Sequence, residues 1–269
     1  MTSHFRVVRN VMLALVISMS MFSTLFAASA QGGTGAFLMF MPAVVHQFPD
    51  QLPDLAMAKV TGLSISYENE RRVLRFSTTI VNIGSGPFEV LGSREDTSVE
   101  LMDSTQRIYH TGGGYRDIGT PAKMVFAGDG HTHWHLKDLE TYELFQLDNN
   151  NRVAVGNKVG YCFYDNIEFM LNLPGAPASP VYLSCGGMRS LSIVTGLSVG
   201  WGDKYPAALP GQDLDITGLP AGVYRLLITS DQANLFLESN ENNNFTWMDI
   251  QLLSADGLDY KVIGYGPSA

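Results

Sequence analysis

The chain has 269 residues, of which 45% are hydrophobic, and its 17 basic and 26 acidic residues give a net charge of −9 at pH 7. This is enough apolar material for the core of one large domain, because all-β domains often reach roughly 200 to 250 residues. The acidic balance argues against nucleic acid as a partner and favours the attraction of a cationic substrate such as an amine.

The N-terminal segment has the pattern of a secretory signal. Arg6 and Arg9 precede an apolar run from Val11 to Ala28, and small residues of the A-x-A type follow just before Gln31. We therefore expect residues 1–30 to be a signal peptide that directs the chain to the periplasm, the cell surface or the medium, with no membrane insertion after cleavage. The alternative is an uncleaved signal anchor, because the run approaches the roughly 20 residues that a membrane span needs.

Residues 53–253 are expected to form one domain, after a linker at residues 31–52 and before a C-terminal tail at residues 254–269. Short runs of alternating, β-branched and aromatic residues are separated by turn-forming residues, and no helical periodicity follows the signal segment. This pattern is typical of an all-β fold, a β-sandwich with long irregular loops. The expected strands are Val60 to Tyr67, Arg72 to Val81, Phe88 to Leu91, Ile108 to Tyr109, His133 to Leu147, Val153 to Val155, Val159 to Tyr164, Ser190 to Thr195, Val223 to Ser230 and Thr246 to Leu252.

Three of the six histidines, His131, His133 and His135, lie at alternate positions beside Trp134. Side chains alternate faces along a strand, so the three imidazoles point the same way. Neutral imidazole suits zinc, copper, iron and nickel, and three such ligands leave a position open for water, oxygen or substrate. The outer two residues are roughly 13 Å apart on an ideal strand, so the backbone has to bend to bring them onto one ion. The alternative is a histidine-rich strand whose rings pack on neighbours or lie in solvent.

Further motifs accompany the histidines in a fixed order. The stretch RRVLRFSTTIVNIGSGPFEV precedes HTHWH, and GNKVGYCFYD, LSVGWGDKY, DLDITGLPAGVYRLLI and ESNENNN follow it. In order and spacing these motifs resemble the catalytic domain of the lysyl oxidases, from about residue 53 to residue 250. The resemblance implies a prokaryotic-type or cysteine-poor member of that family, with copper bound by the three histidines.

The resemblance also implies a cofactor made from two side chains of the chain itself. Lysyl oxidases are similar in joining a lysine to a tyrosine ring, with copper and oxygen, to give lysine tyrosylquinone, and Lys158 and Tyr205 occupy the matching positions. Such a quinone converts a primary amine, a lysyl side chain or a small amine, to an aldehyde with release of hydrogen peroxide and ammonia. Asp203, two residues before Tyr205, is the candidate base, and an Asx turn is the alternative role for it. The expected enzyme is a copper-dependent amine oxidase of the protein-lysine 6-oxidase type.

A second cluster rich in oxygen ligands, ESNENNN, resembles the family motif that binds calcium together with an upstream P-D-L piece. Carboxylate, amide and backbone carbonyl oxygens are the ligands that Ca²⁺ prefers. An asparagine replaces the aspartate of the family motif, which lowers the charge of the site, and a polar hairpin turn is the alternative. The residues concerned are Asp54, Leu55, Glu238, Asn240, Asn243 and Asn244.

The chain has only two cysteines, Cys162 and Cys185. An even pair in an exported protein indicates one disulfide, which would brace the segment that carries Lys158. Two buried free thiols are the alternative. Animal lysyl oxidases carry several more cysteines in this domain, and Trp201 lies near where one of them would fall.

Two other functions are compatible with the residues. An extracellular β-sandwich could bind copper without catalysis. The motif H-x-H-W also occurs in the α-carbonic anhydrases, where a third histidine comes from a distant strand and zinc lowers the pKa of bound water. Here the third histidine is the adjacent His135. A carbonyl-reactive hydrazine separates the amine oxidase from the other two hypotheses, because only an active quinone reacts with it.

Overall fold

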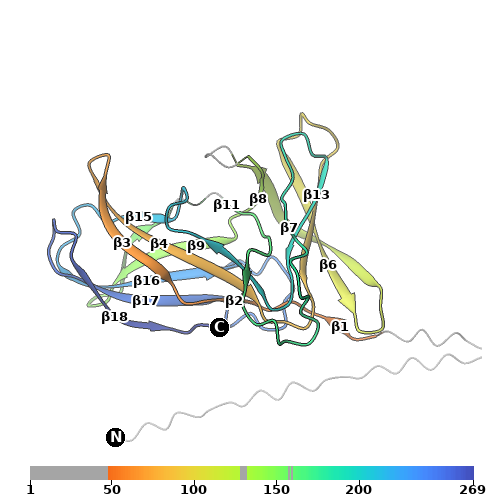
Figure 1. Ribbon diagram of the computed structural model, residues 1–269. Coiled ribbons are helices and arrows are strands. Elements are labelled where there is room, and N and C mark those ends of the chain that lie inside the picture. The colour runs from red at the N-terminus through yellow and green to blue at the C-terminus, as the bar shows by residue number, and fades with distance from the viewer. Residues whose placement is uncertain (1–47, 128–131, 157, 159) are drawn as a thin grey trace, which may run out of the picture. The chain divides into compact units, whose positions relative to one another are not determined.

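The structure, a computed structural model, describes residues 48–127, 132–156, 158 and 160–269. Within these ranges the chain forms eighteen strands and no helix, which confirms the predicted all-β class. No helix in this part of the chain is long and apolar enough to cross a membrane. The strands form three antiparallel sheets (Figure 1).

The largest sheet carries the histidine motif near one edge. It has seven strands, with β1 pairing on β6 outside the main path. In spatial order the strands are β11 (Gly160–Tyr161), β8 (Trp134–Lys137), β7 (Tyr115–Phe126), β6 (Leu101–His110), β5 (Phe88–Ser93) and β13 (Ser192–Leu197), with β1 at Asp50–Gln51.

The other two sheets have five and six strands. The first is β10 (Asn151–Val155), β9 (Glu140–Gln146), β16 (Gly222–Ser230), β17 (Phe245–Leu252) and β18 (Tyr260–Gly266). The second is built around the long β4, which pairs with four strands; its members are β12 (Ile167–Glu168), β14 (Trp201–Tyr205), β4 (Arg71–Asn82), β15 (Asp213–Asp215), β2 (Leu55–Met57) and β3 (Thr61–Glu68).

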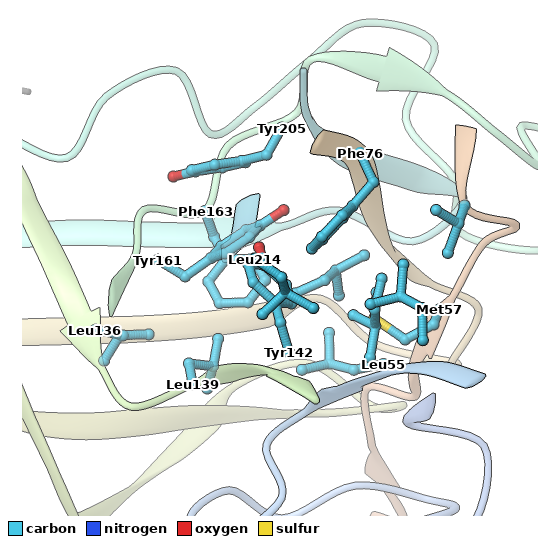
Figure 2. Close-up of a cluster of buried hydrophobic side chains, with 14 of the residues drawn as sticks. Leu55, Met57, Phe76, Leu136, Leu139, Tyr142, Tyr161, Phe163, Tyr205 and Leu214 are labelled. Carbon is cyan, nitrogen blue, oxygen red and sulfur yellow. The ribbon is translucent and has the colours of Figure 1, made fainter. Parts of the chain in front are cut away.

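One hydrophobic core receives side chains from all three sheets. Burial alternates along β16, as expected for a strand with one face in the core. Figure 2 shows aromatic rings at the centre of this core, where Phe76 meets Tyr142 edge to face at 4.9 Å and Tyr161 stacks on Tyr205 at 4.1 Å. A fully buried large apolar side chain stabilises a fold by roughly 1.5 to 3 kcal/mol. Tyr205 is therefore a member of the core as well as of the site described below.

The prediction of one long strand from His133 to Leu147 is wrong. The chain breaks into β8 and β9, which belong to different sheets. Asp138 between them has a φ of 56°, in the left-handed region that aspartate tolerates better than most residues. The break sends β8 to pair with β7 and β9 to pair with β16. It therefore places the histidine motif where two sheets meet.

The sequence pattern also missed whole strands. β7, from Tyr115 to Phe126, escaped because Gly119 and Pro121 interrupt its alternation. Residues 254–269, expected to be a tail, contain β18, which pairs with β17 along most of its length. The segment is thus part of the five-stranded sheet.

Candidate active site

The structure places Lys158 against Tyr205. Lys158 precedes β11, and Tyr205 is the last residue of β14. Lys158 Nζ lies 3.8 Å from the centre of the Tyr205 ring. Both side chains are buried, with 6% of Lys158 and 3% of Tyr205 exposed. A cation over the face of an aromatic ring is attracted by the ring quadrupole. The two residues that the resemblance pairs as cofactor precursors thus lie side by side.

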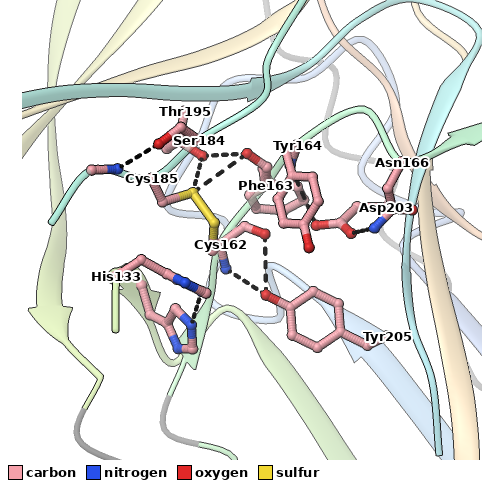
Figure 3. The surroundings of a disulfide bond; sticks show 12 residues. His133, Cys162, Phe163, Tyr164, Asn166, Ser184, Cys185, Thr195, Asp203 and Tyr205 are labelled. Carbon is pink, nitrogen blue, oxygen red and sulfur yellow. Dashed lines mark hydrogen bonds between the residues drawn. A yellow bond between two sulfur atoms is a disulfide. The ribbon is translucent and has the colours of Figure 1, made fainter. Parts of the chain in front are cut away.

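Tyr205 is held in place by contacts to its ring and to its hydroxyl. Its ring stacks on that of Tyr161 at an interplanar angle of 27°. Its hydroxyl accepts a hydrogen bond from the backbone N–H of Cys162 at 2.9 Å and donates one to the carbonyl oxygen of the same residue at 3.1 Å (Figure 3). Burial raises the pKa of Tyr205 well above its usual range, and the nearby Asp203 acts in the same direction. Tyr205 is therefore a neutral phenol held in one orientation.

Lys158 Nζ is surrounded by oxygen atoms and rings. Glu140 Oε2 lies 3.8 Å away. We assign the Gln212 amide with its oxygen toward Lys158 Nζ at 2.7 Å, because the opposite orientation would direct its NH₂ group at the ammonium. The sequence patterns did not indicate Glu140, Tyr142 or Gln212, since these residues come from β9 and from the loop before β15.

Asp203 shares a face of β14 with Tyr205, because side chains two residues apart on a strand point the same way. It is fully buried and accepts hydrogen bonds from the backbone N–H of Tyr164, at 3.4 Å, and from the side-chain amide of Asn166. Its pKa is raised well above the usual value by burial, against the opposing effects of the Tyr164 N–H and the Lys158 ammonium. These contacts, visible in Figure 3, differ from the local Asx turn that was the alternative.

His133 and His135 turn their rings toward each other. Their Nε2 atoms are 3.0 Å apart and their ring centres 4.8 Å apart. Two nitrogens that each lie about 2.0 to 2.1 Å from one ion, at right angles around it, are roughly 3 Å apart. The observed separation therefore fits two neighbouring ligands of one metal ion. His131, the third predicted ligand, lies outside the described residues.

A cavity of about 600 Å³ opens between these groups. Both His133 and Tyr205 line it, so the candidate metal site and the candidate cofactor face the same space. Its size is within the range of pockets that bind small molecules. One cation, Lys204, is also part of its wall. The other lining residues are Thr132, Tyr164, Asn166, Ile167, Pro206 and Leu209.

A disulfide joins Cys162 to Cys185, as predicted. Each cysteine also contacts one part of the site. Cys162 holds the Tyr205 hydroxyl through its backbone, and the carbonyl oxygen of Cys185 accepts a hydrogen bond from the backbone N–H of Trp134 at 3.1 Å. Trp134 lies between the two described histidines. The disulfide therefore connects the tyrosine side of the site to the histidine side (Figure 3).

The family model described as lysyl oxidase matches residues 100–256, which is more than half of the chain. The chain belongs to the lysyl oxidase family. Protein-lysine 6-oxidase of Homo sapiens is 30% identical over 127 residues, which cover 45% of this chain and 26% of that protein. Protein-lysine 6-oxidase of Sus scrofa is 29% identical over 127 residues, covering 45% of this chain and 44% of that protein. Lysyl oxidase homolog 4 of Mus musculus is 26% identical over 175 residues, covering 65% of this chain and 18% of that protein.

The chain thus spans less than half of the length of each of these relatives. The part that matches the lysyl oxidase family contains the histidine motif, Lys158, Asp203 and Tyr205. Asp54 and Leu55, the upstream piece of the second cluster, precede it.

In this lysyl oxidase family member the structure brings the two pieces of the second cluster together. Glu238 accepts a hydrogen bond from the backbone N–H of Leu55, and Asn244 Nδ2 donates to Glu238 Oε1 at 2.9 Å. Asn243 Nδ2 donates to Asp54 Oδ1 at 2.7 Å. Among the described residues, the buried side-chain oxygens Asn243 Oδ1 and Asn244 Oδ1 have no hydrogen-bond partner. The cluster therefore contains oxygens that are available to a cation.

The acidic members of this cluster differ from those expected. Asn240 is exposed, and its side-chain oxygen accepts a hydrogen bond from the backbone N–H of Asn242 at 3.1 Å, within its own turn. Carboxylate oxygens of Asp231, Glu238 and Glu241 instead lie within 4.8 Å of one another. Burial raises the pKa of Asp231 to about 6 and that of Glu238 to about 8. Sequence reasoning missed Asp231 because it follows β16, seven residues before the motif.

Proposed function

We propose that this lysyl oxidase family member is a copper-dependent amine oxidase that converts primary amines to aldehydes, with release of hydrogen peroxide and ammonia. The observation that carries the proposal is the contact of Lys158 Nζ with the Tyr205 ring at 3.8 Å, beside a cavity that His133 also lines. The names of the relatives indicate oxidation of protein lysine, so a lysyl side chain or a small alkyl amine is the proposed substrate.

The proposed cofactor is lysine tyrosylquinone formed from Lys158 and Tyr205, which would supply an electrophilic carbonyl for the amine. The cavity admits the substrate to the Tyr205 edge of the buried site. Asp203 is the proposed base. Burial raises its pKa, which favours the uptake of a proton by this carboxylate. Tyr164 and Asn166, which bond to its carboxylate, both line the cavity.

Copper is proposed to bind His131, His133 and His135. The 3.0 Å separation of the Nε2 atoms of His133 and His135 supports a shared ion, and neutral imidazoles with open positions suit copper. Copper would supply the redox chemistry that, with oxygen, oxidises the Tyr205 ring during cofactor formation. Alanine in place of any one histidine should sharply weaken copper binding while the unfolding transition stays cooperative.

A peroxide-release assay on the copper-loaded protein, across a panel of lysyl peptides and alkyl diamines, tests the activity. The control is Tyr205→Phe, which removes the ring oxygen from which the quinone begins. We expect peroxide release by the wild type and background levels from the variant. Activity that survives in Tyr205→Phe would mean that copper acts without a quinone, and copper binding without peroxide or hydrazine labelling would indicate a non-catalytic copper-binding module.

The second cluster is proposed to bind calcium. The support is its set of oxygens, in which Asp231 and Glu241 supply the charge that Asn240 lacks, together with Glu238, Asp54, Asn243 and Asn244. Leu55 would contribute its backbone oxygen. Like-charged carboxylates this close together are costly unless a cation or a proton lies between them. Calorimetric titration with Ca²⁺ should show one site, weakened by Asp231→Asn.

Export is also proposed, with residues 1–30 as the signal peptide. Residues 53–253 are proposed as the main part of the catalytic domain, to which β1 from the expected linker and β18 from the expected tail add strands. The Cys162–Cys185 disulfide supports export, because disulfides persist in oxidising compartments such as the periplasm and the extracellular space. N-terminal sequencing of the exported protein should begin at Gln31.

A further inference from the structure

Glu140 is a buried carboxylate that none of the roles above uses. It is the first residue of β9, and its side chain is fully excluded from solvent. The Tyr142 hydroxyl donates a hydrogen bond to its Oε2 atom, and Thr78 is a further hydrogen-bonding neighbour. A buried carboxylate is costly unless a cation compensates its charge, so the cation beside it matters.

The charge that faces this carboxylate is Lys158. The distance of 3.8 Å between Glu140 Oε2 and Lys158 Nζ is that of an ion pair. Nζ lies between this carboxylate, the Gln212 oxygen and the Tyr205 ring. The pKa of Glu140 is raised by burial, which the Lys158 ammonium opposes.

The titratable groups that face Glu140 come from three elements. Tyr142 shares β9 with it, Tyr161 comes from β11, and Asp203 and Tyr205 come from β14. The tyrosines are neutral phenols, because burial raises the pKa of each well above its usual range. Asp203 is bonded to Tyr164 and Asn166.

We propose that Glu140 is a positioning residue for cofactor formation, which holds the Lys158 amine against the Tyr205 ring and accepts the proton that this amine must lose. The proposal rests on the proposed function. An ammonium has no lone pair, so Lys158 has to release a proton before its nitrogen can bond to carbon. Lys158 is buried, and the Glu140 carboxylate, 3.8 Å from Nζ, is placed to receive that proton.

With copper bound at the histidines, oxygen would oxidise the Tyr205 ring to a quinone, which adds one oxygen atom to the ring and releases water. Lys158 gives a proton to Glu140, and its lone pair forms the C–N bond at a ring carbon, whose hydrogen leaves as a proton as the ring becomes a diphenol. A second oxygen molecule reoxidises the joined ring and leaves as hydrogen peroxide. The joined residues have gained one oxygen atom and lost four hydrogen atoms relative to free lysine and tyrosine.

The first test uses metal-free protein and does not depend on the cofactor. Trinitrobenzenesulfonate labels accessible neutral amines. Mass mapping of the peptide that contains Lys158, at successive times, gives the rate at which this lysine is labelled. Glu140→Gln keeps the size of the side chain and removes its charge. We expect labelling of Lys158 to rise by about tenfold or more, because an amine without its buried partner either turns toward solvent or sheds its proton. Labelling equal to that of the wild type would overturn the placement of Lys158 by Glu140.

Glu143→Gln is the matched control. Glu143 lies on the opposite face of the same strand, is also buried, and pairs with Arg152 at 2.7 Å. It should leave Lys158 labelling unchanged. Glu140→Asp, which keeps a carboxylate, should restore most of the protection, and it separates loss of charge from general disturbance of the core.

The second test follows the Lys158–Tyr205 joined peptide by mass after copper and oxygen are added. At neutral pH, Glu140→Gln should form it about a hundredfold more slowly than the wild type, with normal copper content. Its rate should rise more steeply with pH, because hydroxide or buffer then takes the proton. An unchanged rate and pH profile would contradict the proton-accepting role. A wild-type chain that binds copper and never forms the joined peptide would overturn the proposed function, while the labelling result would still decide the placement of Lys158.

Discussion

Gly160 sits where the strand that carries His135 meets the strand that follows Lys158. It pairs with Lys137 across β8 and β11. A Cβ atom added at Gly160 would lie 2.5 Å from the Leu136 carbonyl oxygen and 2.8 Å from His135 Cβ. Ordinary contacts are longer, so Gly160→Ala has to push the two strands apart by roughly half to one ångström, and overpacking of this kind costs about 1 to 3 kcal/mol.

The displacement acts directly on the proposed copper ligand. Because a shift of about 1 Å in a positioned group can cost on the order of a hundredfold, we expect Gly160→Ala to weaken copper binding more than it weakens the fold. Urea unfolding and copper titration measure the two effects. Gly119→Ala in β7 is the control, since no atom lies within 4 Å of a Cβ at that position, and it should leave both unchanged or slightly raise stability. If the Gly160→Ala variant kept the stability and the copper affinity of the wild type, this account of the strand contact would be refuted.

Replacing both Cys162 and Cys185 with serine should lower the free energy of unfolding by about 3 kcal/mol, because the disulfide spans 23 residues; it should also slow cofactor formation, as followed by hydrazine labelling. Lys204→Glu should lower the KM for an alkyl diamine severalfold, because an anion in place of a cation at the cavity wall favours binding of the diamine by about 1 kcal/mol of Coulomb energy. An unchanged KM would exclude this lysine from substrate selection. Asp231 and Glu238 have raised pKa values of about 6 and 8, so without calcium their contribution to stability is complete below about pH 4 and is lost as pH rises through 6 and 8. Calcium should therefore raise Tm more at pH 8 than at pH 5, and equal shifts at both would speak against binding at this cluster.

The approach of the His133 and His135 rings was readable from sequence, because side chains two residues apart in an extended segment point the same way, and His133 directly precedes β8, which contains His135. The break that follows Lys137 was not readable. It lies at Asp138, whose left-handed backbone divides one polar and apolar run between two sheets. A local pattern of side chains cannot report which partner strand each half will choose.

The surroundings of Lys158 were beyond the sequence for the same reason. Glu140 and Gln212 lie just outside the motifs, and only the pairing of β9 with β16 and of β15 with β4 brings them to the lysine. Asp231 was likewise hidden, because its role depends on the loop that returns from β16 to Glu238. Motifs thus identified the reacting residues, whereas the buried charges around them emerged from topology.

The most direct test of the central claim is peptide mass mapping of the wild-type protein before and after loading with copper in air. We predict that the separate peptides with Lys158 and Tyr205 disappear on loading and that one joined, oxidised peptide replaces them, with the same protein becoming reactive toward phenylhydrazine. Two unmodified peptides in fully copper-loaded protein would contradict the account.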